Sequence, residues 1–406
     1  MKNVVSNIQV LRAVAAQSVA TYHLQPMINA SFGTDLKLPV GAVGVDIFFV
    51  ISGFIMFYTN RYNDRAAHDF LANRFIRIVP LYWLATGCIA TLFILGFHPN
   101  GLHYLTPEIF VRSLIFIRSD FPDGRTDLVL SLGWTLIYEI FFYILFAATL
   151  ATSSLKLRLL IINLLFVVAV TVRFAFETFS GTAPFLCSSI LFEFGFGCGL
   201  ATLYLNWNPT PSRRLLIVAT ATLVFGIALS IQGATFHQER LDELRVLYFG
   251  IPALLIVSAA LLYERIGRRI TNRSALLLGA ASYSLYLFHP ILLQSTVKFT
   301  AHLLPSNSSI SPILAALLAS VVAIAASIII YLQIEQRILR GGHKFAAKLH
   351  RKRAIPVSLA NTPQNRQLSI AASPTTSTLP DLDSRPPPSI AMVENTEQSS
   401  DTTQPK

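Results

Sequence analysis

The segment IQVLRAVAAQSVATYHLQPMI, residues 8–28, carries two ionisable side chains inside an apolar run that is long enough to cross a membrane. Arg12 and His23 lie about three helical turns apart at 3.6 residues per turn, so both face the same side of a helix. A charge at membrane depth costs at least about 2.5 kcal/mol, and few chains keep one there without a use for it. The segment therefore predicts a polar site buried inside a helical bundle.

The composition of the whole chain places it among membrane proteins. Of its 406 residues, 53% are hydrophobic and only 13% are charged, and the mean hydropathy is +0.55. An ordinary soluble protein carries about 25% charged residues. Apolar runs of about twenty residues recur, each able to cross a hydrocarbon core of about 30 Å. We therefore predict an all-α fold, a polytopic transmembrane helical bundle.

The predicted bundle has about ten spans. The first span is expected to remain as a helix rather than leave as a signal peptide, because Arg12 interrupts its apolar core and no cleavage site follows. A further run at 108–118 is too short and too charged to span, and we expect it to be interfacial or re-entrant. The spans lie at residues 8–28, 43–59, 79–97, 132–151, 157–177, 185–205, 214–232, 245–263, 275–296 and 311–333.

The net charge of +11 is explained by its distribution along the chain rather than by a nucleic-acid partner. Lys and Arg concentrate in alternate loops between the predicted spans, and the positive-inside rule then places both termini in the cytoplasm. The basic stretch GGHKFAAKLHRKR, residues 341–353, suits anionic lipid headgroups on that side. Membrane lipids are therefore expected partners, and nucleic acid is not.

The chain divides into a predicted transmembrane domain, residues 1–340, and a cytoplasmic segment, residues 341–406. From about residue 354 the composition turns to Ser, Thr, Pro and Gln, which predicts a disordered tail. The cysteines lie within predicted spans without metal-ligand spacing, so we expect apolar packing, no metal site and no bound cofactor. These cysteines are Cys88, Cys187 and Cys198.

Four ionisable side chains fall at a similar depth, in the outer halves of four predicted spans. They are His23, Asp46, Glu139 and His289. Two imidazoles and two carboxylates are suitable for proton transfer near neutral pH. The alternative is that each group is satisfied locally by a hydroxyl or a carbonyl. The common depth favours one shared catalytic site, and Pro290 is expected to bend the helix there.

The segment NRFIRIVPLYW, residues 73–83, leads into the third predicted span. Arg74 and Arg77 are one helical turn apart, a spacing at which two guanidinium groups can hold a phosphate. The alternative is ordinary anchoring of the chain on the inner face. Tyr82 and Trp83 fit an interfacial aromatic belt, and we include them with the arginines as candidate substrate contacts.

The second predicted span begins with the glycine-rich segment GAVGVDIFFVISGF, residues 41–54. Gly41, Gly44 and Gly53 predict close approach between helices. Ser52 has no neighbouring base in the sequence and no nucleophile-elbow pattern, so we expect it to pack or to form a hydrogen bond.

The most informative motifs, in chain order, are LRAVAAQSVATYH (11–23), GAVGVDIFFVISGFIM (41–56), NRFIRIVPLYW (73–83), SLGWTLIYEIFFY (131–143) and ASYSLYLFHP (281–290). Together they resemble the membrane acyltransferase 3 family, and within it the bacterial exopolysaccharide and O-antigen O-acetyltransferases of the ExoZ kind. The resemblance runs from about residue 8 to residue 335, although spans five to eight match mainly by hydropathy.

This resemblance implies transfer of an acyl group, most simply acetyl, from cytoplasmic acyl-CoA in the bacterial inner membrane. The implied acceptor is a hydroxyl of an exopolysaccharide, of another cell-surface glycan, or of its lipid-linked precursor. The family's first-span Arg and His fall on Arg12 and His23. Its cytoplasmic Arg pair falls on Arg74 and Arg77, and its fourth-span acidic residue on Glu139.

Acyl transfer needs a base, a stabilised oxyanion and a held donor. We expect His23 to act as the base for the acceptor hydroxyl or as a transient acyl carrier. Glu139 or Asp46 would orient an imidazole, and His289 is one candidate for the group that meets the oxyanion. The arginine pair would hold the phosphates of coenzyme A, with Arg12 lining the route to His23.

A proton-coupled transporter of a small solute is the alternative function, because intramembrane His, Glu and Arg also mark transport pathways. The sequence shows no inverted repeat between its halves and no paired broken helices. These two observations favour the enzyme.

Overall fold

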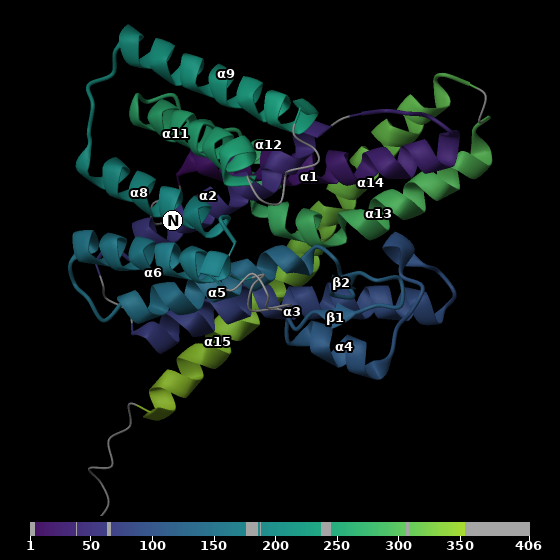
Figure 1. The fold of residues 1–406 in the computed structure, drawn as a ribbon, viewed down its shortest axis with the longest axis horizontal. Helices are drawn as coiled ribbons and strands as arrows, with labels where there is room; N and C mark the ends of the chain where they lie inside the picture. The colour runs from purple at the N-terminus through teal and green to yellow at the C-terminus, as the bar shows by residue number, and fades with distance from the viewer. Residues whose placement is uncertain are drawn as a thin grey trace, which may run out of the picture. The chain divides into compact units, whose positions relative to one another are not determined.

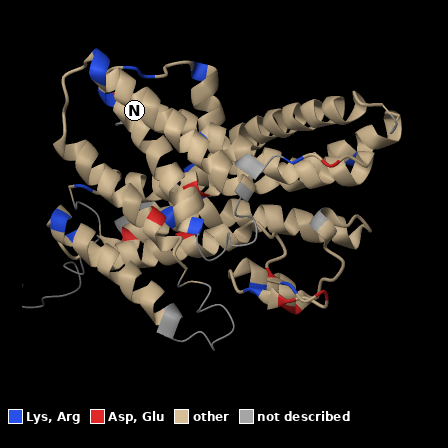
Figure 2. Cartoon of the chain, turned by 45° about the horizontal axis from the view of Figure 1, so that its top comes forward, with Lys and Arg blue, Asp and Glu red and all other residues tan. Residues whose placement is uncertain are grey.

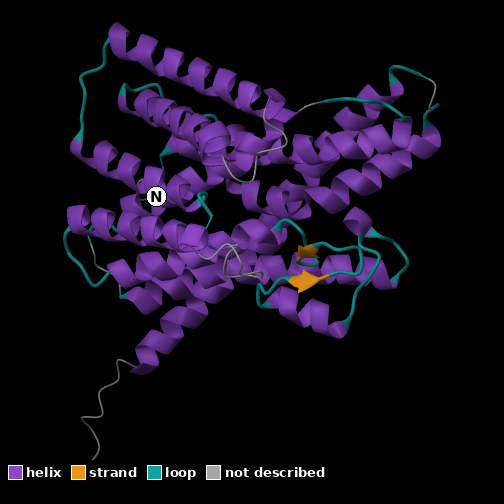
Figure 3. Ribbon diagram, in the orientation of Figure 1, coloured by secondary structure: helices purple, strands orange, loops and turns teal. Residues whose placement is uncertain are grey.

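The computed structural model describes residues 5–37, 39–62, 66–175, 186, 188–236, 245–305 and 308–353. This part of the chain is almost entirely helical, and its strands form one short antiparallel hairpin (Figure 3). Cys187 and the tail from residue 354, for which we predicted packing and disorder, lie outside the described residues.

The elements follow one another in this order. The first half contains α1 (Ser6–Phe32), the 3₁₀ turn η1 (Pro39–Ala42), α2 (Val43–Thr59), α3 (Ala67–Ile94), η2 (Pro99–Gly101), α4 (Pro107–Leu114), β1 (Ser119–Asp120), β2 (Thr126–Asp127), α5 (Gly133–Thr149) and α6 (Leu155–Ala175). The second half contains α8 (Leu191–Asn206), α9 (Arg213–Phe236), the π-helical turn η4 (Val246–Gly250), α11 (Ile251–Arg265), α12 (Arg273–Ala280), α13 (Ser282–Leu303), α14 (Ser311–Ile330), the π-helical turn η5 (Tyr331–Glu335) and α15 (Gln336–Arg353).

Each predicted span overlaps a helix of the structure. Among the described residues, five helices are long and apolar enough to cross a membrane, or six if α12 and α13 are taken as one bent span. α2 and α5 are apolar as well but have only 17 residues each. The protein is an all-α, multi-pass membrane protein, while the number of ten spans and the cytoplasmic termini stay predictions.

The ninth predicted span is broken rather than straight. α12 and α13 meet at Ala281 with a bend of 68°, whereas α13 continues without interruption through Pro290. The bend that we expected beside His289 therefore lies at Ala281 instead. Gly279, two residues before Ala281, lies so close to the carbonyl of Gln9 that a Cβ would clash with that oxygen. The chain therefore turns where α12 meets α1.

Glycines set the spacing between the central helices, as predicted. A Cβ at Gly41 or Gly44 would clash with backbone carbonyls of α1. A Cβ at Gly53 of α2 would clash with the backbone of α8, and a Cβ at Gly197 of α8 would clash with the backbone of α2. These contacts let α2 lie directly between α1 and α8 and bring polar groups of neighbouring helices together.

Residues up to Arg351 form one unit. In this unit α9 pairs with α11 and α13 pairs with α14, while α3, α5 and α6 lie together on another side of the bundle (Figure 1). Most of the helical ribbon in Figure 2 is uncharged, and acidic and basic positions both occur near the middle of that view. α15 runs without a break through residue 340, so the domain boundary that we predicted there falls inside a helix and stays a prediction.

Candidate active site

A cavity of about 290 Å³ collects the arginines that the sequence singled out. Arg12 enters it from α1, and Arg74 and Arg77 enter it from α3, where they lie one turn apart on the same helix face. α2, α5 and α13 complete the wall. We call this the arginine cavity. Three half-buried guanidinium groups around one space are an arrangement that favours an anionic ligand.

The carboxylate of Glu139 is fixed at the wall of the arginine cavity. It accepts a hydrogen bond from Ser52 Oγ at 3.2 Å and another from Tyr143 Oη. Arg74 lies over the ring of Tyr143, 5.8 Å from its centroid. Glu139 is thus held by hydroxyl groups beside the arginines, and neither of these two partners is an imidazole. Ser52 forms the hydrogen bond that we expected of it.

The region contains a second acid, Glu335 of η5, for which the sequence predicted no role. Its side chain is 1% exposed, and its Oε2 accepts a hydrogen bond from Ser284 Oγ at 2.6 Å. It interacts electrostatically with Arg77 and Arg12. In the sequence it lies between the last predicted span and the basic stretch, a position at which an acidic residue is expected to be exposed.

His23 lines a second cavity, of about 460 Å³, which we call the histidine cavity. Its wall is formed by α1, α13 and the loops that precede α4 and α5. The ring centroids of His23 and His289 are 5.3 Å apart. The structure therefore brings together these two of the four side chains that we placed at one depth.

His289 is fully buried behind His23. Its Nδ1 lies 3.1 Å from the carbonyl oxygen of Leu285, and because a carbonyl only accepts, Nδ1 carries the proton. Nε2 then keeps its lone pair, and it has no hydrogen-bond partner within the described part of the chain. The two imidazoles are therefore in ring contact, but the described residues show no hydrogen bond between them.

Tyr286 connects the two cavities. Its side chain lines the arginine cavity, while its ring centroid lies 6.2 Å from that of His289. Its hydroxyl is 2.8 Å from Thr135 Oγ1, another group of the arginine cavity. Leu132, whose carbonyl accepts from Tyr286 Oη at 3.4 Å, lines the histidine cavity. One layer of side chains thus separates the arginine cavity from the imidazole pair.

Asp46 does not join the histidines, contrary to our expectation of a shared site. Its two carboxylate oxygens each accept a hydrogen bond from Arg245, at 2.9 Å, in a bidentate pair. Glu193, which is also buried, interacts electrostatically with both. Arg245, at the first position of the eighth predicted span, directly precedes the π-helical turn η4 and reaches inward from there. The close approach of α2 to α8 brings Asp46 and Glu193 together.

Tyr82 and Trp83 face α4 and do not line the arginine cavity. Tyr82 is fully buried and its hydroxyl donates to the carbonyl of Ser113 at 2.9 Å. Trp83 Nε1 donates to the carbonyl of Leu114 at 2.8 Å. These contacts anchor the short amphipathic helix α4 on α3. The role of the two aromatics as substrate contacts stays a prediction, and their geometry accounts for them as anchors.

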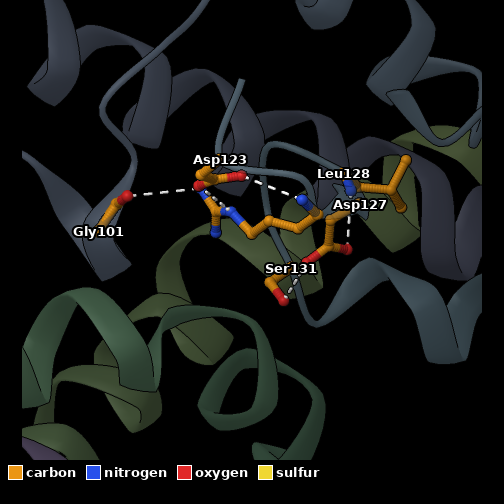
Figure 4. Close-up of polar contacts among 6 residues, drawn as sticks. Gly101, Asp123, Asp127, Leu128 and Ser131 are labelled. Carbon is orange, nitrogen blue, oxygen red and sulfur yellow. Dashed lines mark hydrogen bonds and ion pairs between the residues drawn. The ribbon is translucent and has the colours of Figure 1, made fainter. Parts of the chain in front are cut away.

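The loop between β2 and α5 forms one edge of the histidine cavity. Asp127 accepts hydrogen bonds there from Ser131 Oγ at 2.6 Å and from its neighbour Leu128 N–H at 2.8 Å (Figure 4). Burial raises the pKa of Asp127, although both hydrogen bonds favour the charged form. Ser131 itself lines the cavity, so Asp127 fixes the orientation of one wall hydroxyl.

The cations of the histidine cavity are Arg125 and Lys298. Arg125 Nε donates to Asp123 Oδ2 at 2.7 Å, and its Nη2 donates to the carbonyl of Gly101 at 3.4 Å. Lys298 Nζ lies 4.8 Å from the centroid of the Phe97 ring. The cation at Arg125 is therefore paired with its neighbour Asp123, whereas Lys298 contacts an aromatic ring.

Comparison with known proteins agrees with the resemblance seen in the motifs. A family profile described as an acyltransferase domain matches residues 5–332. The chain is 31% identical over 318 residues to the exopolysaccharide production protein ExoZ of Rhizobium meliloti, covering 78% of this chain and 95% of that relative. It is 25% identical over 323 residues to the peptidoglycan O-acetyltransferase OatA of Listeria monocytogenes, covering 72% of this chain and 50% of that relative. No solved structure matches the chain.

Proposed function

The chain belongs to the acyltransferase 3 family and is a membrane O-acyltransferase, and from that premise we propose that it moves an acyl group, most simply acetyl, from acyl-CoA to a glycan hydroxyl. The acceptor is an exopolysaccharide, another cell-surface glycan, or a lipid-linked precursor. The observation that carries the proposal is the position of Tyr286, which lines the arginine-rich cavity and lies 6.2 Å from the ring of His289, the neighbour of His23 in the second cavity.

The arginine cavity is the proposed donor site. Coenzyme A presents several phosphates, and guanidinium groups are suited to hold phosphate through paired hydrogen bonds. Arg74 and Arg77 would hold the phosphates at the inner face, and Arg12 would guide the thin pantetheine arm toward the imidazoles. The positive-inside distribution of Lys and Arg supports the cytoplasm as the side from which the donor enters, and the bacterial inner membrane as the location.

The histidine cavity is the proposed acceptor site. The hydroxyl oxygen of the acceptor attacks the thioester carbonyl carbon, while His23 takes the hydroxyl proton. The carbon–sulfur bond then breaks, and the leaving thiolate takes up the proton that His23 accepted and departs as free coenzyme A. His289, whose ring lies against that of His23, would keep the His23 ring in position. Tyr286 would donate a hydrogen bond to the oxyanion that forms between the cavities.

Isotope transfer in membrane vesicles tests this function. Inside-out vesicles that contain the protein receive acetyl-CoA labelled in the acetyl group, and the glycan is then recovered and treated with mild alkali. We expect label in the glycan fraction that alkali releases as acetate, and none from vesicles without the protein. Solute uptake without any label in the glycan would instead favour the transporter, and label from a donor other than acyl-CoA would overturn the donor assignment.

A further inference from the structure

Glu335 continues a row of buried residues along the last membrane helix. The buried residues of α14 include Ala319, Ala323 and Ser327, which are spaced four residues apart. Glu335 follows Ser327 by eight residues and so belongs to the same series, and it is buried within the π-helical turn η5.

The carboxylate is only half satisfied at this position. Oε2 accepts the hydrogen bond from Ser284, but Oε1 is buried and has no hydrogen-bond partner within the described part of the chain. Such an oxygen costs free energy unless a charge compensates it. The cations that act on it are Arg77 and Arg12, both of which line the arginine cavity.

The positive charge of the arginine cavity favours a carboxylate nearby. Three guanidinium groups around one cavity repel one another, and Glu139 is already engaged by two hydroxyls. Glu335 supplies a second negative charge close to the cavity, beside the wall segment that contains Tyr283. We propose that Glu335 is the internal counter-charge of Arg77 and Arg12, offsetting their charge while no donor is bound and competing for them with the donor phosphates.

This inference rests on the proposed donor site and makes Glu335 a positioning residue that acts through the arginines. A counter-ion that competes with the ligand lowers affinity, whereas a purely structural acid does not. It also links donor binding to α15, which begins at the next residue and packs through Gly342 against Ile76, between the two arginines of α3. Glu335 thereby couples the occupied cavity to the basic helix that follows.

Titration of the purified protein with coenzyme A tests the proposal. Glu335→Gln removes the competing charge while keeping the shape of the side chain, so we expect about tenfold tighter binding. Ser284→Ala releases the carboxylate toward the arginines, so we expect binding about threefold weaker. Glu264→Gln is the matched control, because Glu264 is also buried but pairs with Asn7 and Arg269 instead. Unchanged or weaker binding in Glu335→Gln overturns the proposal.

The proposal can also be decided if Glu335→Gln does not fold, or if the unsubstituted protein binds no coenzyme A. If Glu335→Gln does not fold, the sign of the Ser284→Ala effect decides, since unchanged or tighter binding there contradicts a competing carboxylate. If the unsubstituted protein binds no coenzyme A, the donor assignment fails, and inorganic pyrophosphate then serves as the probe. A larger rise in melting temperature with pyrophosphate for Glu335→Gln than for the unsubstituted protein supports the counter-ion, and an equal rise refutes it.

Discussion

The arginine cavity and the histidine cavity lie on either side of Tyr286 and differ in the ionisable side chains that surround them. The first gathers three guanidinium groups beside the carboxylate of Glu139, with Glu335 as the proposed counter-charge. The second offers a half-buried imidazole whose neighbour has a free lone pair, and its cation at Arg125 is neutralised locally. Holding an anion and moving a proton call for these two environments. Substitutions on the two sides should therefore separate binding from transfer.

The largest expected effect is on the histidine side. His23→Ala should lower acyl transfer to the glycan by about 10²–10⁴-fold, the usual contribution of a general base. Coenzyme A binding should persist because the arginine cavity is untouched. Steady-state transfer and calorimetric binding measured on the same preparation check this, with His103→Ala of an exposed loop as the control. Full transfer activity in His23→Ala would remove this imidazole from the mechanism.

On the arginine side, Arg74→Gln combined with Arg77→Gln should raise KM for acyl-CoA by about 10- to 100-fold through the loss of charged hydrogen bonds. KM for the acceptor should stay constant. Arg213→Gln combined with Arg214→Gln removes the same charge from an exposed helix start and serves as the control. An equal loss in both double variants would show that the α3 arginines act only in membrane insertion or anchoring.

The layer between the cavities should respond more weakly. Tyr286→Phe removes the hydroxyl that meets Thr135 and should lower kcat by about two- to tenfold, with donor affinity retained. Thr135→Val should have a similar effect, and the double variant should be no worse than either alone because both act on one contact. Additive losses in this cycle would show that the two hydroxyls act separately.

The smallest effect concerns the wall of the histidine cavity. Burial raises the pKa of Asp127, so its charged form disfavours folding, and that cost is present above the ordinary aspartate pKa of about 3.9 and absent below it. Asp127→Asn should change the melting temperature by less than about 3 °C, in favour of the variant near pH 7. The difference should vanish near pH 3. A variant that is less stable at pH 7 would mean that the hydrogen bonds to Asp127 outweigh its burial.

The sequence located the helices well because each span is a long local pattern. All ten predicted spans overlap helices, and the glycines of α2 act as predicted. It also selected Arg12, Arg74, Arg77 and Glu139, which line one cavity. The grouping of the other ionisable residues by depth was only partly informative. Depth along a helix does not state which face a side chain takes, so Asp46 was assigned to the wrong neighbours.

Two inward-facing partners could not be found without the structure. Arg245 and Glu335 lie at the ends of apolar segments, where a charged residue is typical of the membrane interface. Each is next to or within a π-helical turn, η4 or η5, where the local geometry departs from that of a regular α-helix.

By itself, the sequence determined that this chain is an all-α membrane protein with charged groups in its spans, because hydropathy and helical period are local properties. Tertiary structure decided which ionisable groups meet which partners: His23 meets His289, Asp46 meets Arg245, and Glu335 meets Ser284. The physical reason is that a charge in an apolar bundle must be compensated by whatever neighbour the helix packing brings within reach. That neighbour is set by glycine contacts and π-turns between segments far apart in the chain.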